Sequence, residues 1–210
     1  LTNLDEWVSR GVEPPPSRHP RLDDGTAVTR DRTLARFDAG PDTVKPDPER
    51  LWVVRQVGLG PDADRGIGRY PVEEGAAYAC LVSDVDADGN ETAGIRLPDL
   101  AVPVGTHTGW NPRHPETGAA DQVIPMQGFT SFFAPTREAG QRSGDRRPSV
   151  EERYRDRDAY LEQVRAVARR LVAERYLLEE DLEIVVEACA ERFDTATRSV
   201  PSLLPVGDSP

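Results

Sequence analysis

Prolines divide this chain into parts that can and cannot form long regular structure. Between Leu97 and Pro148 they recur at positions 98, 103, 112, 115, 125, 135 and 148. Proline has a fixed φ and no backbone N–H to donate, so it interrupts helices and central strands. This segment is therefore predicted to form long proline-rich loops, which usually either carry function or wrap another surface. A shorter connector of the same kind, VEPPPSRHP, follows Gly11.

The final third is predicted to be a helical hairpin over residues 149–195. Ser149 and Glu152 have the spacing of a capping box at a helix start. Apolar residues then recur at helical spacing on both sides of a break near Tyr176-Leu177. The first stripe is Tyr154, Leu161, Val164, Ala168, Leu171 and Val172, and the second is Leu182, Val185, Val186, Cys189 and Phe193. Residues 196–210 are predicted to be a flexible tail.

The sequence LTNLDEWVSRG places Leu1, Leu4 and Val8 on one face of a short helix, and Gly11 is a typical C-cap. A helix of this length needs a surface on which to dock. We therefore expect the chain to be cut from a longer protein, and for that reason its localisation is left open.

Two further segments have strand signals. LWVVRQVGL, residues 51–59, is bounded by Pro48 and by a Gly-Pro turn. SDVDADGNETAGI, residues 83–95, has aspartates at 84, 86 and 88, like the opening of a calcium loop. Calcium loops need a bidentate acid at the twelfth position, which is Ile95 here. Asp88-Gly89 instead predicts the turn of a β-hairpin.

Composition excludes several kinds of partner. The net charge is −11 and the basic residues are interleaved with acids, so no nucleic-acid partner is expected. No apolar run approaches the length of a bilayer span, so no membrane partner is expected. Gly66 and Gly68 lack phosphate-loop spacing, and no cofactor is expected. Cys80 and Cys189 lack CxxC spacing, which excludes a zinc ribbon or a disulfide scaffold.

The sequence contains no activated nucleophile. The G-x-S-x-G motif of a serine hydrolase is absent, and Ser131 in GFTSFF is predicted to be a loop serine among packed aromatic residues. Cys189 is predicted to be buried in the helical hairpin, and Cys80 lies in a strand-like run. No catalytic residue is therefore assigned.

Two histidines fall in the proline-rich segment. His107 and His114, with Glu116 or Asp121, could supply metal ligands, but no H-E-x-x-H or H-x-H spacing supports a metal site, and none is predicted. His107, Trp110 and Asn111 in GTHTGWN are instead candidate substrate-binding residues. We expect them to be partly buried, with their loop against the helical hairpin or the edge of a core. The alternative is that Trp110 only holds this loop in place.

Three stretches of the sequence carry a family resemblance: LDEWVSRGVEPPPSRHPRL, VDADGNETAGIRLPDLAVPVGTHTGWNPR, and RPSVEERYRDRDAYLEQVRAVARRLVAERYLLEEDLEIVVEACAERFD. They resemble the C-terminal part of a family of bacterial proteins described only as α/β-hydrolase domain-containing. The resemblance spans about Leu4 to Asp194 and weakens between about Asp31 and Ala76. It implies an α/β fold, with a mostly parallel central sheet, and serine hydrolase activity.

In α/β-hydrolases the catalytic order along the chain is Ser, acid, His. The resemblance therefore implies that the serine lies upstream of Leu1, and that the catalytic histidine lies there too or is His107. Residues 1–11 would be the last helix of a truncated hydrolase core, and residues 12–148 an extended, hairpin-containing appendage. Within itself the chain would be α+β.

The expected function is that of the C-terminal part of an ester or amide hydrolase, inactive alone. Its expected partners are a small-molecule substrate and the upstream hydrolase core. One alternative is a noncatalytic binding or interaction module whose proline-rich segments wrap a partner. Another is a metal hydrolase that uses His107 and His114.

Overall fold

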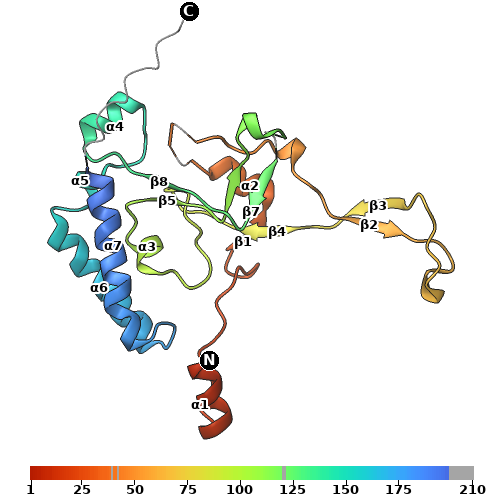
Figure 1. Cartoon of the computed structure of the whole chain (residues 1–210), viewed down its shortest axis with the longest axis horizontal. Coiled ribbons are helices and arrows are strands. Elements are labelled where there is room, and N and C mark those ends of the chain that lie inside the picture. The colour runs from red at the N-terminus through yellow and green to blue at the C-terminus, as the bar shows by residue number, and fades with distance from the viewer. Residues whose placement is uncertain (39, 42, 120–121, 199–210) are drawn as a thin grey trace, which may run out of the picture.

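The computed structural model describes residues 1–38, 40–41, 43–119 and 122–198. A cluster of helices, α3 to α7, lies at one end, and short strand pairs lie beside it (Figure 1). The pair β2–β3 projects away from this body, and α1 lies below it in the same view (Figure 1). Among the described residues every sheet is a two-stranded antiparallel pair. The chain is therefore α+β, as predicted, and its described part does not form a parallel central sheet.

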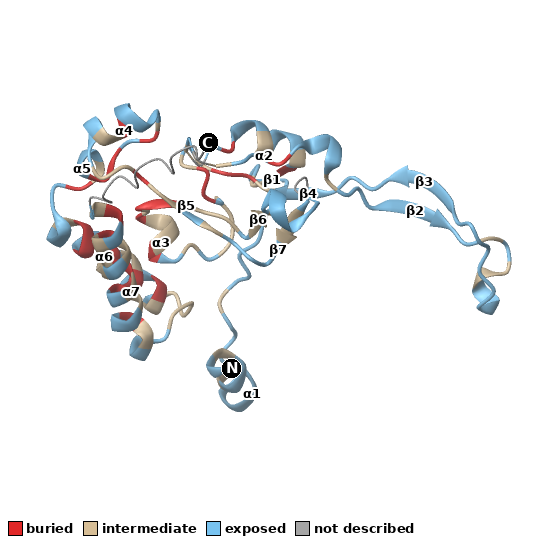
Figure 2. Cartoon of the chain, turned by 45° about the horizontal axis from the view of Figure 1, so that its top comes forward, coloured by how far each residue is buried: buried red, intermediate tan, exposed pale blue. Residues whose placement is uncertain are grey.

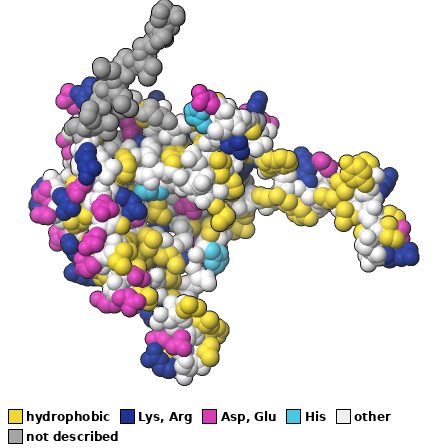
Figure 3. Space-filling view, viewed as in Figure 1, with side chains coloured by type: hydrophobic (Ala, Val, Ile, Leu, Met, Phe, Trp, Pro, Cys, Tyr) yellow, Lys and Arg dark blue, Asp and Glu magenta, His cyan; other side chains and the backbone are white. Residues whose placement is uncertain are grey.

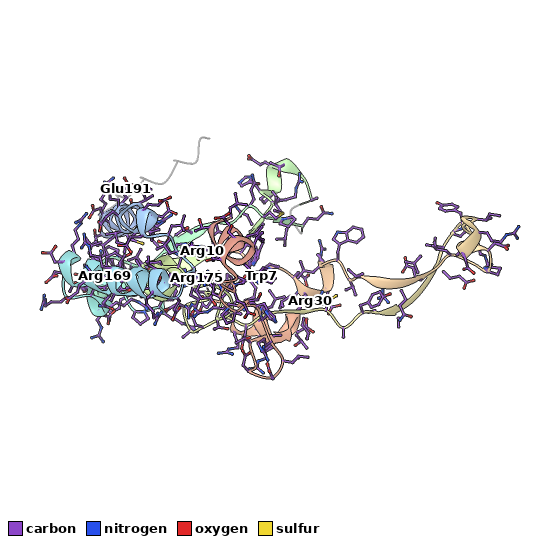
Figure 4. All side chains as sticks on the ribbon, turned by 90° about the horizontal axis from the view of Figure 1, so that it is seen from below. Trp7, Arg10, Arg30, Arg169, Arg175 and Glu191 are labelled. Carbon is purple, nitrogen blue, oxygen red and sulfur yellow. The ribbon has the colours of Figure 1, made fainter. Side chains whose placement is uncertain are left out.

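The N-terminal helix is confirmed as α1 (Thr2–Arg10), which ends at Gly11 with a φ of 68°. Asn3 donates to the Arg175 carbonyl at 3.0 Å, and the Arg175 guanidinium binds Glu6 at 2.8 Å. Figure 4 shows α1, with Trp7, next to Arg175. Polar contacts therefore hold α1 in place while its apolar side chains stay exposed, namely Leu1, Leu4, Trp7 and Val8.

The segment before Pro48 contains a helix that the sequence did not predict. β1 (Ala27–Thr29) leads directly into α2 (Arg30–Arg36), and the Thr29 side chain caps the helix by accepting from the Arg32 N–H. We predicted an extended appendage over residues 12–148, and RDRTLAR has few apolar groups that would indicate a helix. The helix is stabilised instead by its neighbour β4 (Leu81–Ser83), which pairs with β1, and by a 3.0 Å hydrogen bond from Thr33 to the Ser83 carbonyl.

The strand predicted over residues 51–59 is shorter, beginning at Arg55. β2 (Arg55–Gly58) pairs with β3 (Glu73–Ala77), and together residues 54–78 form the β2–β3 arm. β3 was not predicted from the sequence. Two short 3-10 turns, Pro48–Arg50 and Ala63–Arg65, lie before and within the arm. Every residue of both strands is exposed (Figure 2), and hydrophobic side chains spread along the arm (Figure 3).

The turn predicted at Asp88-Gly89 is confirmed, but a full hairpin around it is not. Gly89 has a φ of 78° and donates to the Asp86 carbonyl at 3.1 Å. Within the described chain the two flanks share one isolated bridge, between Val85 and Glu91. The flanks diverge because β4 pairs with β1, while the downstream flank runs into the short helix α3 (Pro98–Ala101).

The long proline-rich loops predicted between residues 97 and 148 are interrupted by a ribbon of four short strands. β5 (Gly105–His107) pairs with β8 (Thr130–Phe132), and β6 (Trp110–Pro112) pairs with β7 (Val123–Pro125). The 3-10 turn Pro115–Thr117 lies between β6 and β7. The prolines are accommodated because Pro112 and Pro125 lie at strand ends. The prediction of a loop for GTHTGWN was therefore wrong, since this segment supplies β5 and β6.

The helical hairpin is confirmed, with an extra break. After α4 (Arg137–Ser143), the predicted capping box starts α5 (Val150–Arg153), which ends at Tyr154 before α6 (Arg157–Ala173) begins. The 3-10 turn Glu179–Asp181 then leads into α7 (Leu182–Thr197). Ala196 and Thr197 thus extend the helix beyond the predicted boundary at residue 195, so the first residues of the predicted flexible tail are helical. Residues 199–210 of that tail lie outside the described residues.

The main core lies between α6, α7 and the ribbon. Tyr160 stacks on Phe193 with ring centroids 4.8 Å apart. Phe193 belongs to the second predicted stripe, and Tyr160 directly precedes Leu161 of the first. Val104 and Phe133 extend this core into the ends of the ribbon. Burial of side chains of this size contributes roughly 1.5–3 kcal/mol each. Buried residues accordingly concentrate in the helical end and around β5 (Figure 2).

Candidate functional site

The three aspartates of the calcium-like motif each face an arginine. Asp84 accepts from Arg36 at 2.5 Å, and Asp86 accepts from Arg96 at 2.8 Å. Asp88 binds both terminal nitrogens of Arg153, one of them at 2.9 Å. These carboxylates therefore neutralise cations of three different segments. Among the described residues no group of three His, Cys, Asp or Glu side chains is arranged to hold a metal ion.

Asn90 joins this turn to the ribbon, and Arg147 joins the ribbon to Asp145. Asn90 is fully buried, donates to the Gly105 carbonyl at 3.0 Å and accepts from the His107 N–H at 2.8 Å. Arg147 forms a buried ion pair with Asp145 at 2.8 Å and also donates to the Thr106 hydroxyl at 2.7 Å. Burial alone would raise the pKa of Asp145, but hydrogen bonds and charge from Arg147 outweigh it, and the pKa lies below its usual value.

His107 is partly buried, as predicted. Its Nδ1 lies 3.0 Å from the Thr130 hydroxyl, across the β5–β8 pair. Its Nε2 is buried and has no hydrogen-bond partner in the described structure. Burial lowers the pKa of His107, the nearby Asp99 carboxylate partly opposes this, and Arg192 reinforces it. His107 is therefore a neutral imidazole at pH 7.

Trp110 is partly buried, also as predicted, and packs in an aromatic cluster. Its ring centroid lies 5.2 Å from that of Phe37 and 5.9 Å from that of Phe129. Phe37 follows α2 and Phe129 precedes β8, so the cluster belongs to the β-rich part of the molecule. We expected GTHTGWN, residues 105–111, to lie against the helical hairpin or the edge of a core. Trp110 instead packs in a second, smaller apolar cluster with Phe37, Val85 and Phe129.

One face of this cluster borders a pocket of about 490 Å³. We call it the Trp110 pocket. It is formed by residues from α2, from residues 46–52, from β4 and the Asp88-Gly89 turn, and from the ribbon. Its lining comprises Arg30, Thr33, Leu34, Phe37, Pro46, Arg50, Leu51, Trp52, Val82, Ser83, Val85, Gly89, Glu91, His107, Thr108, Gly109, Trp110, Gln122, Val123 and Pro125. Its volume falls within the range of small-molecule sites, about 300–1,000 Å³.

Asn111 is partly buried but lines a different depression. This second depression lies beside His114, Thr130 and Ser131 rather than Trp110. Successive residues of a strand point to opposite faces, which separates Asn111 from Trp110. The structure thus brings two of the three candidate substrate-binding residues, His107 and Trp110, to one pocket and places Asn111 outside it.

The other candidate groups do not form a reactive centre in the described residues. His114 and Glu116 are exposed and 3.8 Å apart, far along the ribbon from His107, and Asp121 lies outside the described residues. Ser131 lies in β8 rather than in a loop, and its hydroxyl accepts from Arg147 at 3.2 Å. Cys189 is buried as predicted, burial raises the pKa of its thiol to about 12, and Cys80 is exposed.

Several residues of the pocket were not predicted. Phe37 precedes Pro48, in a stretch with no predicted element, and Trp52 lies in the strand predicted over residues 51–59, where nothing in the pattern indicates a pocket. Their position depends on the unpredicted helix α2 and on contacts between distant segments. A single Trp or Phe in a polar stretch is the one signal that could have indicated them.

The described residues thus form an α+β structure with one apolar pocket beside a strand ribbon. Comparison with protein families identifies the group to which it belongs. Residues 1–187 match the family model described as "Alpha/beta hydrolase domain". The chain belongs to this family, which confirms the resemblance to α/β-hydrolase domain-containing proteins. Comparisons with curated proteins and with solved structures gave no match. None of the described helices is long and apolar enough to cross a membrane.

Proposed function

We propose that this chain is the C-terminal part of an α/β hydrolase that cleaves an ester or amide with a serine nucleophile lying outside these 210 residues. The observation that carries the proposal is the family match over residues 1–187. The sequence contains no G-x-S-x-G motif, and the described strands form no parallel sheet on which such a nucleophile is placed. The partners would be a small-molecule substrate and the hydrolase core.

In this proposal the Trp110 pocket contributes to substrate binding. Trp110 offers a partly buried aromatic surface, and His107 lines the same pocket as a neutral imidazole. Asn111 would act from the neighbouring depression, where its amide can donate or accept a hydrogen bond. A chain with these groups and no nucleophile would bind substrate and have no hydrolytic activity of its own.

A serine-directed fluorophosphonate tests this proposal. The isolated chain is expected to show no stoichiometric labelling at any serine, because labelling requires an activated hydroxyl. The longer polypeptide, purified from its natural source, is expected to be labelled at a serine outside these residues. Stoichiometric labelling of Ser131, or of any other serine of this chain, would contradict the proposal.

Asn111→Ala in the active polypeptide tests the role in substrate binding. A changed KM or kcat with an unchanged melting temperature would support substrate contact by Asn111. A lowered melting temperature with normal kinetics would show that Asn111 only stabilises the ribbon.

The second candidate is a noncatalytic interaction module. It is favoured by the apolar side chains that α1 and the β2–β3 arm expose, since extended apolar surface commonly marks an interaction site. The same labelling experiment separates the two functions. Absence of serine labelling in the natural polypeptide as well would favour the interaction module over the hydrolase.

A further inference from the structure

The wall of the Trp110 pocket is mainly aromatic and aliphatic. The rings of Phe37 and Trp110 are inclined by 52°, and Trp52 enters the lining from the segment before the β2–β3 arm. Trp52 is 88% exposed and Trp110 is only partly buried, so neither ring is fully covered by the chain itself. Two indoles that border one pocket and are only partly covered offer ring surface to another ring. Aromatic pairs with centroids about 4.5–7 Å apart contribute roughly 0.5–1.5 kcal/mol beyond their buried area.

The cations near this pocket already have partners. Arg30 lies 3.2 Å from the carboxylate of Asp31, and Arg50 lies 3.7 Å from that of Asp47. Glu91 adds a negative charge to the lining, and His107 is neutral. Among the described lining residues both arginines are paired with a carboxylate, so an anionic ligand would lose its hydration in an apolar pocket without an unpaired cation to bind. Desolvation of an unpaired charge is costly, so the pocket favours an uncharged ligand.

We propose that the Trp110 pocket binds the neutral aromatic part of a small molecule, by contact with Trp110 and Trp52. This inference deepens the proposed hydrolase function, on which its biological meaning rests, because it names the substrate class as uncharged aryl or arylalkyl esters or amides. Binding itself needs no nucleophile and can be measured on the chain as it is.

Isothermal titration with three probes tests the proposal. 2-Naphthamide is neutral and aromatic, 2-naphthoate has the same shape with a negative charge, and hexanamide is neutral and aliphatic. We expect saturable binding of 2-naphthamide with one site per chain. We expect binding about tenfold weaker or more for the other two, since each lacks either neutrality or ring contacts. Equal binding of 2-naphthoate or of hexanamide would overturn the assigned ligand class.

Matched variants locate the binding site. Trp110→Ala and Trp52→Ala are each expected to weaken 2-naphthamide binding about tenfold, the equivalent of one or two ring contacts. Trp52 is exposed, so its replacement tests the pocket even if Trp110→Ala fails to fold. The control is Tyr70→Ala, which removes a 94% exposed ring from the arm, outside the pocket. Binding that is lost in Tyr70→Ala but kept in Trp52→Ala would overturn the proposal, as would no binding at all.

These results are separate from those of the labelling experiment. If 2-naphthamide does not bind but the natural polypeptide is labelled by fluorophosphonate, the ligand class is wrong and the hydrolase function stands. If 2-naphthamide binds in the pocket and no serine is labelled, the pocket assignment stands without the hydrolase function.

Discussion

At the scale of single residues, the contacts of Asp88 explain why a calcium-like motif occurs here. Its carboxylate binds Arg153, whose guanidinium also lies over the Phe133 ring at 4.1 Å from the centroid. Both side chains of the ion pair are largely buried, with 16% and 18% exposed. The motif therefore joins the turn to α5, and its aspartates are required for packing.

Asp88→Asn is expected to destabilise the fold by about 1–3 kcal/mol, because a largely buried guanidinium loses its charged partner. Urea unfolding measures this free energy. Asp64→Asn is the control, since Asp64 is exposed in the β2–β3 arm and its replacement is expected to change stability by less than about 0.5 kcal/mol. Equal stabilities for the two variants would show that the Asp88–Arg153 pair contributes nothing.

The lowered pKa of His107 predicts a pH effect on stability. Its folded pKa lies below the unfolded value of about 6.5, so below pH 7 the unfolded chain binds more protons. The contribution of His107 is therefore fully present above the unfolded pKa and is lost as pH falls toward the folded pKa. We expect His107→Gln to show a smaller fall in unfolding free energy between pH 7.5 and about 5.5 than the parent chain.

His114→Gln provides the control for this effect, since His114 is exposed. Its pH profile is expected to follow that of the parent chain. A fall in stability that is the same for His107→Gln and the parent would mean that burial does not shift the titration of His107.

At the scale of elements, local signals predicted α1 and the helical hairpin but missed α2, α3, α4 and most of the strands. α1, α6 and α7 follow from apolar periodicity and from caps such as Gly11, because these patterns act within a few residues. The ribbon depends on pairing across more than 20 residues, as between His107 and Thr130. Gly128 permits this pairing, because a Cβ there would lie 1.8 Å from the Thr108 carbonyl oxygen.

The candidate site was predictable only in part for the same reason. His107 and Trp110 were identified from the composition of one short segment, and both do line the pocket. Phe37 and Trp52 reach it through α2 and the residues before the arm, and these tertiary contacts could not be predicted from local patterns. Asn111 was grouped with Trp110 because a loop was expected, and strand alternation separates the two.

The β2–β3 arm is expected to contribute little to the stability of the rest of the chain. Arg55 and Ala77 are paired across its base, and no residue between them is buried. Replacing residues 56–76 with Asn-Gly supplies a two-residue hairpin turn. The unfolding free energy is expected to change by less than about 0.5 kcal/mol, as for surface changes in general. A loss of more than about 2 kcal/mol would show that the arm packs on the body.

At the scale of the whole molecule, the core is asymmetric. It is concentrated between α6, α7 and the ribbon, while α1 and the arm contribute exposed apolar surface (Figures 2 and 3). The protein therefore has a stable helical end and a β-rich end that holds the pocket. In the proposed hydrolase, this β-rich end would meet the substrate.

The reactivity of the two cysteine thiols tests whether the helical core is packed as described. Cys80 is exposed, whereas Cys189 is buried in the helical core and burial raises the pKa of its thiol to about 12. Reaction with a thiol reagent such as dithionitrobenzoate at pH 8 is expected to modify one thiol rapidly and the second only after denaturant is added. Mass spectrometry of the modified peptides identifies each site. Rapid modification of Cys189 in the native protein would contradict the packing of α6 against α7.

In this member of the alpha/beta hydrolase domain family, the Trp110 pocket is proposed to bind a neutral aromatic ligand. The most direct test is a crystal structure of the chain soaked with 2-naphthamide. We predict ligand density in the pocket, with the naphthalene ring in contact with Trp110 and Trp52. Density only on the β2–β3 arm, or an empty pocket in a crystal whose soak exceeds the measured Kd, would contradict this claim.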